Sequence, residues 1–243
     1  MTPTEAVRAS RHLVAETFML DPATRAAGRE RGLRSWPAYY VGRGGVLGDV
    51  AAEVVEAAFV FLPAASVAKG WAAGTSVLTP EDGAQLFGGL AASWGRDRLA
   101  ALTVQEVGRL AVLAAAVVDA APVGCLPLFA GWRAQPRPAD AAGCAGLLLH
   151  CLRELRGGLH GVAVVAAGLD PVEAIVAGPY GEDNAAWFGW TPPYPAVTPE
   201  LAARWAAAEE VTVARLATAY SVLSRSELAE LAALAGRVGA VHA

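Results

Sequence analysis

Residues 141–156 read AAGCAGLLLHCLRELR, and this stretch decides the fold. Its apolar residues recur with the three- to four-residue spacing of a helix, and it contains no proline. We therefore predict a long helix from Ala141 to Arg156. Gly157 and Gly158 follow, and because glycine weakens a helix we predict a break there. A further helix is expected from Leu159 to Ala167, closed by Gly168.

Capping residues mark most of the other helix starts. Thr79 precedes a proline and two carboxylates, and Thr103 is followed three residues later by Glu106, which predicts a capping box. Asp21 precedes a proline, which is typical of a helix start. Ser224 is followed three residues later by Glu227, which predicts a second capping box. Helices are expected at 4–18, from 22, at 49–59, from 63, and at 79–94, 104–118, 199–223 and 224–241.

The helical pattern defines the fold class. No alternation of β-branched residues is long enough to predict a sheet. We expect an all-α, multi-helix, two-lobed bundle with an N-terminal lobe at 1–120, a proline-containing connector at 121–140 and a C-terminal lobe at 141–243, unless these form one continuous domain. The last two helices look apolar on one face, which suggests a homodimer interface.

Composition points to a cytoplasmic protein. The chain of 243 residues is 55% apolar, yet no apolar run reaches the about 20 residues of a membrane-spanning helix. The first residues do not resemble a secretion signal. Three cysteines, Cys125, Cys144 and Cys151, lack the spacing of a zinc site or a disulfide framework. The net charge of −4 disfavours contact with phosphate backbones.

The polar residues with the most chemical potential lie close together in the sequence. Arg153 and Arg156 share a helix face, which suits a clamp for a carboxylate or phosphate, and His160 is the residue type that titrates near neutral pH. We interpret His160 as a catalytic acid and base, oriented by Glu154, with no metal or cofactor. Ordinary salt bridges would use the same residues. A metal site of His150, Glu154 and His160, or haem ligation by His160, is a weaker alternative.

Aromatic residues supply the apolar part of the predicted ligand site. We assign six residues to ligand binding. They are Trp36, Tyr39 and Tyr40 before the Gly-rich joint at 41–48, Arg43 within that joint, and Trp187 and Trp190 within the irregular stretch 179–199. Such residues line ligand pockets between helices. Each is also of a type that packs at ordinary helix joints.

Three segments carry a resemblance to a known family: GRGGVLG at 42–48, FVFLP at 59–63 and LRELRGGLHGVAVVAAGLD at 152–170. The chain resembles a large actinobacterial family of helical proteins labelled helix-turn-helix or winged-helix. The resemblance spans most of the chain and implies its fold. Members carry a hairpin wing after a Gly-Trp pair like Gly189-Trp190, and that wing looks absent here. Their first-helix histidine aligns with Ala15, whereas this chain has His12.

The resemblance leaves three functions open: an enzyme, a ligand-binding protein and a DNA-binding regulator. The helices after Trp190 sum to a charge of −1, so we do not expect them to bind DNA. We expect a protein that binds an apolar or aromatic small molecule with an acidic group, as a cofactor-independent acid-base enzyme of secondary metabolism, such as a cyclase, dehydratase or isomerase. The alternatives are a non-catalytic ligand-binding protein and a helix-turn-helix transcriptional regulator.

Overall fold

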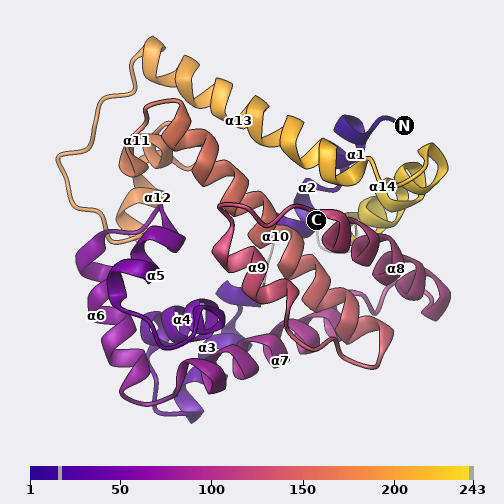
Figure 1. Ribbon diagram of the computed structural model, residues 1–243, viewed down its shortest axis with the longest axis horizontal. Coiled ribbons are helices and arrows are strands. Elements are labelled where there is room, and N and C mark those ends of the chain that lie inside the picture. Colours follow the sequence, from indigo (N-terminus) through magenta and orange to yellow (C-terminus); the bar gives the residue numbers. More distant parts are fainter. Residues whose placement is uncertain (16–17, 241–243) are drawn as a thin grey trace.

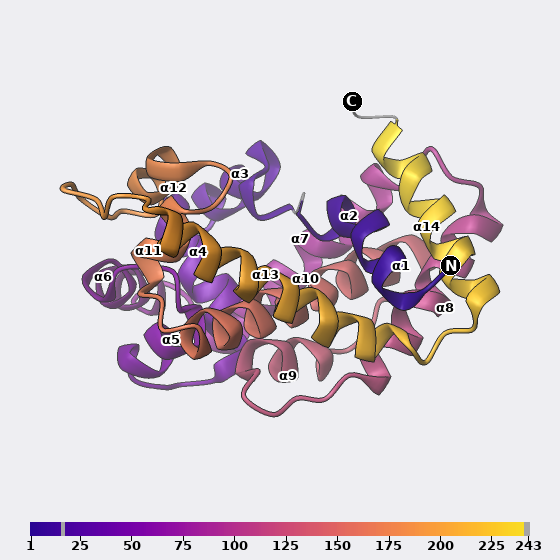
Figure 2. The ribbon, with the colours of Figure 1, turned by 90° about the horizontal axis from the view of Figure 1, so that it is seen from above.

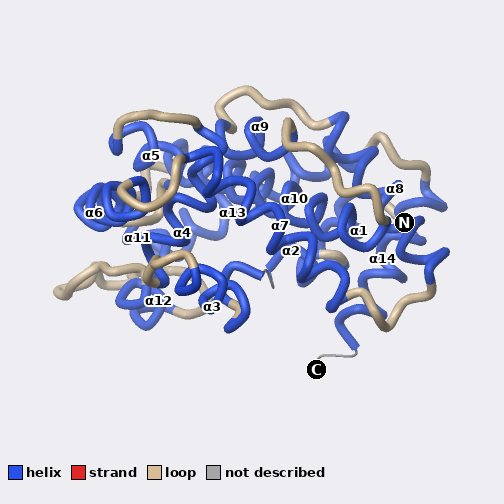
Figure 3. The backbone as a smooth tube through the Cα atoms, turned by 90° about the horizontal axis from the view of Figure 1, so that it is seen from below, coloured by secondary structure: helices blue, strands red, loops and turns tan. Residues whose placement is uncertain are grey.

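The computed structural model describes residues 1–15 and 18–240. Within them the chain forms fourteen α-helices and two short 3-10 helices, and no strand (Figure 1, Figure 3). The all-α prediction is therefore confirmed. The elements are α1 Pro3–Ala9, α2 Arg11–Ala15, η1 Phe18–Leu20, α3 Pro22–Glu30, α4 Ser35–Gly44, η2 Gly45–Leu47, α5 Ala52–Phe59, α6 Ala64–Thr75, α7 Pro80–Arg98, α8 Val104–Ala120, α9 Pro127–Arg133, α10 Ala141–Ala166, α11 Pro171–Val176, α12 Gly181–Trp187, α13 Pro199–Tyr220 and α14 Arg225–Ala240.

The central element is α10, which contacts α7, α8, α9 and α13. Figure 1 shows it crossing the middle of the molecule, and Figure 2 shows α4, α5, α6, α11 and α12 gathered at one end and α1, α8 and α14 at the other. Helices α10 and α13 run between the two ends (Figure 2). Groups carried by α10 and α13 can therefore meet in the middle of the fold.

The predicted break at Gly157 and Gly158 is wrong. Helix α10 runs through both glycines without interruption and is 26 residues long in total. Helix packing outweighs the weak helix propensity of glycine here. Leu155 before the pair and Val164 after it are fully buried. A Cβ at Gly158 would lie 2.7 Å from Leu126 Cδ2, so the missing side chain lets the start of α9 approach α10.

Glycine also sets the contact between α7 and α10. A Cβ at Gly146 would lie 2.3 Å from the Ala91 carbonyl oxygen, and one at Gly95 would lie 2.5 Å from the Ala142 carbonyl oxygen. Only glycine allows the two backbones to approach this closely.

Capping residues begin several helices as predicted, but the side chain of Asp21 makes no cap hydrogen bond at the start of α3. Thr79 and Thr198 accept backbone hydrogen bonds at the starts of α7 and α13, and Thr103 with Glu106 forms the capping box of α8. Ser224 and Glu227 bond each other's backbone N–H groups before α14.

Other boundaries differ from the prediction. Helix α9 interrupts the connector at 121–140, and α12 interrupts the irregular stretch 179–199. The first predicted helix is divided at Ser10, whose side chain hydroxyl donates to the Ala6 carbonyl oxygen. Its continuation through 16–17 and the predicted end at Val241 lie outside the described residues.

The largest apolar cluster includes buried residues from Ala6 in α1 to Val238 in α14. The apolar residues of α14 lie within this cluster, namely Leu228, Leu231, Leu234, Ala235 and Val238. They face the chain's own core, so they are not the exposed stripe that suggested a dimer. No described helix has the length and hydropathy to cross a membrane.

Candidate functional site

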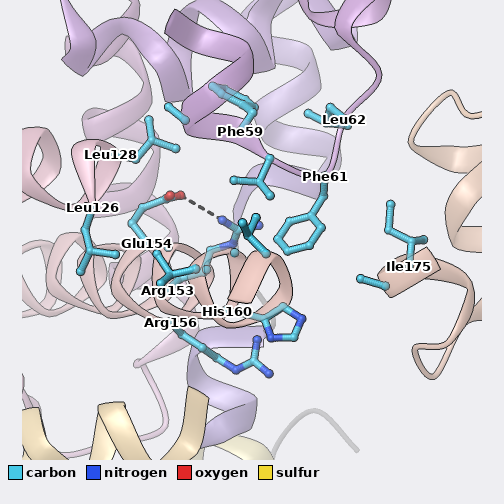
Figure 4. Close-up of a pocket in the computed structure, with 18 of the residues that line it drawn as sticks. Phe59, Phe61, Leu62, Leu126, Leu128, Arg153, Glu154, Arg156, His160 and Ile175 are labelled. Carbon is cyan, nitrogen blue, oxygen red and sulfur yellow. Dashed lines mark hydrogen bonds and ion pairs between the residues drawn. The ribbon is translucent and has the colours of Figure 1, made fainter. Parts of the chain in front are cut away.

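A cavity of about 670 Å³ lies beside the middle of α10. Its lining comes from α10 itself and from α2, α4, α5 and the turn after it, the start of α9, α11, α12 and α13. Most of the wall is apolar, with Phe59, Phe61, Leu62, Leu126 and Leu128 among its side chains (Figure 4). This volume is in the range of small-molecule pockets.

Two ionic clusters interrupt the apolar wall. The first cluster consists of Arg43, Arg153 and Glu154. The Glu154 carboxylate accepts hydrogen bonds from Arg43 Nε and Nη2, both at 2.8 Å, and from Arg153 Nη1 at 2.9 Å. Arg43 also donates Nη1 to the Tyr39 hydroxyl at 2.9 Å. Arg43 is thereby committed to holding Glu154, whereas Arg153 uses only one nitrogen on this carboxylate.

Glu154 is ionised in this setting. Its side chain is 1% exposed. Burial by itself raises the pKa of a carboxyl, but the guanidinium groups of Arg43 and Arg153 outweigh burial and hold the pKa of Glu154 at about 2. A carboxylate held in this way is a poor proton donor or acceptor near neutral pH.

The second cluster consists of Arg11, Arg156, His160 and Glu209. Arg156 Nη2 donates to both Glu209 oxygens, at 2.9 and 3.0 Å, and Arg11 Nη2 lies 3.7 Å from the same carboxylate. His160 Nδ1 lies 3.2 Å from Glu209 Oε1 and 3.1 Å from Thr212 Oγ1. In Figure 4, Arg156 and His160 lie together on α10, apart from the Glu154 carboxylate.

The hydrogen bonds of Thr212 fix the tautomer of His160. The Thr212 hydroxyl donates its only proton to the Ala208 carbonyl oxygen at 2.7 Å. It must therefore accept from His160 Nδ1, and the Glu209 carboxylate, 3.2 Å from the same nitrogen, also favours a proton there. The proton of the neutral imidazole sits on Nδ1, and Nε2 has the lone pair of a base.

Two features of its environment act on the basicity of His160. Burial lowers the pKa of its imidazole, and the Glu209 carboxylate opposes that effect. Its ring stacks on Phe61 with centroids 5.5 Å apart and an interplanar angle of 26°. His160 is therefore largely neutral at pH 7, with a carboxylate placed to stabilise the imidazolium when it forms.

A strained turn holds Phe61 in this position. Val60 has φ 59° and ψ −58°, and the Phe61 N–H donates to the Phe59 carbonyl oxygen at 2.6 Å. This is a γ-turn with positive φ, which a β-branched residue rarely adopts. Val60 faces Gly161, where a Cβ would meet Val60 Cγ2 at 3.1 Å. Strain of this kind is concentrated at functional sites.

The predicted site residues divide into two groups. Arg43, Tyr39, Arg153, Glu154, Arg156 and His160 all line the cavity. The other four predicted residues are absent from its lining. Trp36 and Trp187 contact each other with ring centroids 5.0 Å apart, Tyr40 is buried beside Gly70, and Trp190 Nε1 donates to the Phe61 carbonyl oxygen. These four support the wall from outside.

The predicted contact between Glu154 and His160 does not form. Glu209 occupies that position, and Thr212, Trp205 and Arg11 complete the surroundings. Sequence reasoning missed these residues. The signal present was the spacing of Trp205, Glu209 and Thr212, which puts three side chains on one face of a helix.

His150 does not join His160 in a metal site. It is buried between Phe18, Phe87 and Trp132, and neither ring nitrogen has a hydrogen-bond partner among the residues that the structure describes. Burial lowers the pKa of His150 to about 3, despite Glu154 nearby. Within the described residues, no group of three histidine, cysteine or acidic side chains has the geometry of a metal site. His12 of α2 lies elsewhere and contacts the Ala235 carbonyl oxygen.

These features define a class: an all-helical protein with an apolar cavity that carries arginine, carboxylate and histidine side chains. The chain belongs to the helix-turn-helix family, whose model matches residues 4–193. The comparison with curated proteins and the comparison with solved structures each found no match. The family match ends before α13, so Trp205, Glu209 and Thr212 lie outside it.

Proposed function

We propose that this protein binds an apolar or aromatic small molecule bearing an acidic group in the cavity beside α10. One observation carries the proposal: among the described residues, four arginines and two carboxylates, Glu154 and Glu209, line a mostly apolar cavity. The side chains of Arg43, Arg153 and Arg156 are 8%, 28% and 23% exposed, whereas that of Arg11 is 54% exposed and solvated. Because charges shielded from water need partners, the three shielded arginines favour an anionic ligand. The apolar wall favours a ligand whose remaining surface is hydrocarbon.

The arrangement of His160 supports acid–base chemistry on such a ligand. Nε2 can accept a proton from a carbon next to a carbonyl or carboxylate group, while an arginine stabilises the enolate that forms. The same Nε2 then returns the proton to another ligand atom, or to a hydroxyl that leaves as water. Isomerisation, cyclisation and dehydration all fit this proton balance without a cofactor.

Binding is tested with 2-naphthoate, an aromatic carboxylate, by isothermal titration calorimetry. Arg153→Gln should raise Kd about tenfold or more, because a charge-assisted hydrogen bond is worth about 1.5–3 kcal/mol. Arg225→Gln, which removes an exposed arginine from α14 at the far end of the molecule, is the matched control. No binding by the wild-type protein would contradict the proposal.

Catalysis is tested with phenylpyruvate, an aromatic 2-oxo acid with an acidic C–H bond. The wild-type protein in D2O should accelerate deuterium incorporation at C3, followed by NMR, and His160→Asn should lose the acceleration while still binding the probe. If the wild-type protein binds phenylpyruvate without accelerating exchange, the enzyme proposal fails and a ligand-binding role remains.

DNA binding is a second candidate, favoured by the family match and by one structural observation. Helices α3 and α4 are joined by four residues, 31–34, with Gly32 at φ 79°. A short turn that contains glycine is typical of a helix-turn-helix. Four arginines of this unit are exposed and make no ion pair within the described residues: Arg25, Arg29, Arg31 and Arg34. These arginines lie before Trp190, outside the helices whose net charge of −1 argued against DNA binding.

The DNA candidate is tested by mobility shift on bulk duplex DNA at several salt concentrations. Neutralising contacts to phosphates makes affinity fall steeply with salt. A double variant, Arg29→Gln with Arg34→Gln, should weaken binding and reduce the salt dependence, and Arg225→Gln should change neither. Absence of any shift at low salt would exclude this candidate.

A further inference from the structure

The positive charge in the cavity is divided between two places. The first cluster places two guanidinium groups, from Arg43 and Arg153, around the single Glu154 carboxylate. The second cluster places those of Arg11 and Arg156 around the single Glu209 carboxylate. Among the described side chains, arginines outnumber carboxylates by one in each cluster. In the second cluster the additional arginine, Arg11, is 54% exposed and solvated.

Each cluster also retains hydrogen-bonding capacity. Arg153 donates only Nη1 to Glu154, and Arg156 donates only Nη2 to Glu209. A guanidinium group has five N–H donors in a planar fork, so each of these arginines keeps an edge for a second acceptor. Their side chains are 28% and 23% exposed, so they are accessible from the cavity but largely shielded from bulk water.

The two clusters are close enough for one molecule to reach both. Arg153 and Arg156 lie three residues apart on α10, a rise of about 4.5 Å along the helix axis. Phe61 and the other apolar side chains of the wall border the same cavity (Figure 4).

Resting on the proposed binding function, we infer that the ligand is a dianion: an apolar or aromatic body with two acidic groups, one held at Arg153 and the other at Arg156. One acidic group alone would leave the free edge of Arg153 or of Arg156 without an acceptor. Two acidic groups use the free edge of each arginine.

The test compares 2-naphthoate with naphthalene-2,6-dicarboxylate and naphthalene-1,4-dicarboxylate, which share one ring system and differ in the number and spacing of carboxylates. Calorimetry at neutral pH should show at least one dicarboxylate binding about tenfold or more tightly than the monocarboxylate. In Arg153→Gln and in Arg156→Gln that dicarboxylate should lose its advantage, since either variant leaves one anion site. Arg225→Gln should preserve it.

The outcomes separate the two proposals. Equal binding of mono- and dicarboxylates by the wild-type protein overturns the dianion and leaves the single-anion site. No binding of any probe overturns the ligand-binding proposal itself. Arg156→Lys keeps the charge and removes the planar fork, so partial recovery in it shows that Arg156→Gln acted through the ligand rather than through misfolding.

Discussion

At the scale of single residues, the carboxylate of Glu209 raises the proton affinity of His160, which burial alone would lower. Glu209→Gln removes that charge and should lower the pKa of His160 further. The measurement is an NMR titration of the His160 ring, assigned with His160→Asn. A fall in pKa is expected because the neutral amide no longer stabilises the imidazolium.

The neighbouring residue provides the control. Glu210 lies next to Glu209 but pairs with Arg8 on the protein surface, and its side chain is 70% exposed. Glu210→Gln should leave the titration of His160 unchanged. An equal effect of both variants would mean that the general field of α13, and not the contact at Nδ1, sets the pKa of His160.

His150 makes stability depend on pH. Its pKa is 6.5 in the unfolded chain and about 3 when folded, so below pH 6.5 the unfolded state binds the extra proton. The free energy of unfolding should fall as pH drops from 6.5 toward 3, by at most about 1.4 kcal/mol per unit from this residue. The carboxyl of Glu154, at about 2 instead of 4.5, adds a loss that begins below 4.5.

Urea denaturation between pH 7 and 4.5 isolates the histidine contribution from that of Glu154. His150→Phe keeps an aromatic ring against Phe18, Phe87 and Trp132 and cannot be protonated, so the pH dependence should flatten. His150→Leu is a second variant for a site that rejects the larger ring. An unchanged slope in both would exclude His150 as its source, and His160, whose pKa burial also lowers, would be next.

Residues of the site that are close in the sequence could be predicted, but their distant ion-pair partners could not. Arg153, Arg156 and His160 were predicted to gather because they are close in the sequence. Arg43 and Glu209, which bond to this segment in space, lie 111 residues before Glu154 and 53 residues after Arg156. Their ion pairs depend on how α4 and α13 pack on α10, which one sequence does not reveal.

At the scale of elements, two glycines of α10 in different surroundings should respond in opposite ways to the same substitution. Nothing lies within 4 Å of a Cβ at Gly157, whereas one at Gly146 would overlap the Ala91 carbonyl oxygen. Gly157→Ala should stabilise the protein by about 0.5–1 kcal/mol. Gly146→Ala should destabilise it by about 1–3 kcal/mol. Chemical denaturation measures both, and a loss of stability in Gly157→Ala would mean that α10 is not continuous there.

The helix starts that carry a threonine cap could be predicted, whereas the starts of α9 and α12 and the end of α10 could not. Threonine caps at 79, 103 and 198 act through bonds within one turn, so a local pattern identifies them. Continuation of α10 through Gly157 depends on contacts with other elements, such as Leu126 against Gly158. Local propensity is the weaker influence in such a helix.

At the scale of the whole molecule, we expect one cooperative unfolding transition. The main apolar cluster joins the first and last described helices, so the lobes at 1–120 and 141–243 share buried surface. Circular dichroism and tryptophan fluorescence should report the same urea midpoint. Two separate midpoints would support independent lobes. Light scattering on the same sample measures whether a dimer forms.

The cavity also contains a thiol that reagents can reach, that of Cys125. This cysteine is exposed and lines the cavity, with φ 61°, whereas Cys144 is partly buried and Cys151 fully so. Burial raises the pKa of both these other thiols, that of Cys151 to about 12, and suppresses their reactive thiolate forms. Small disulfide-bearing fragments should therefore be captured first at Cys125. Intact-mass screening of a fragment library on the unmodified protein would then report directly which chemical groups the cavity retains.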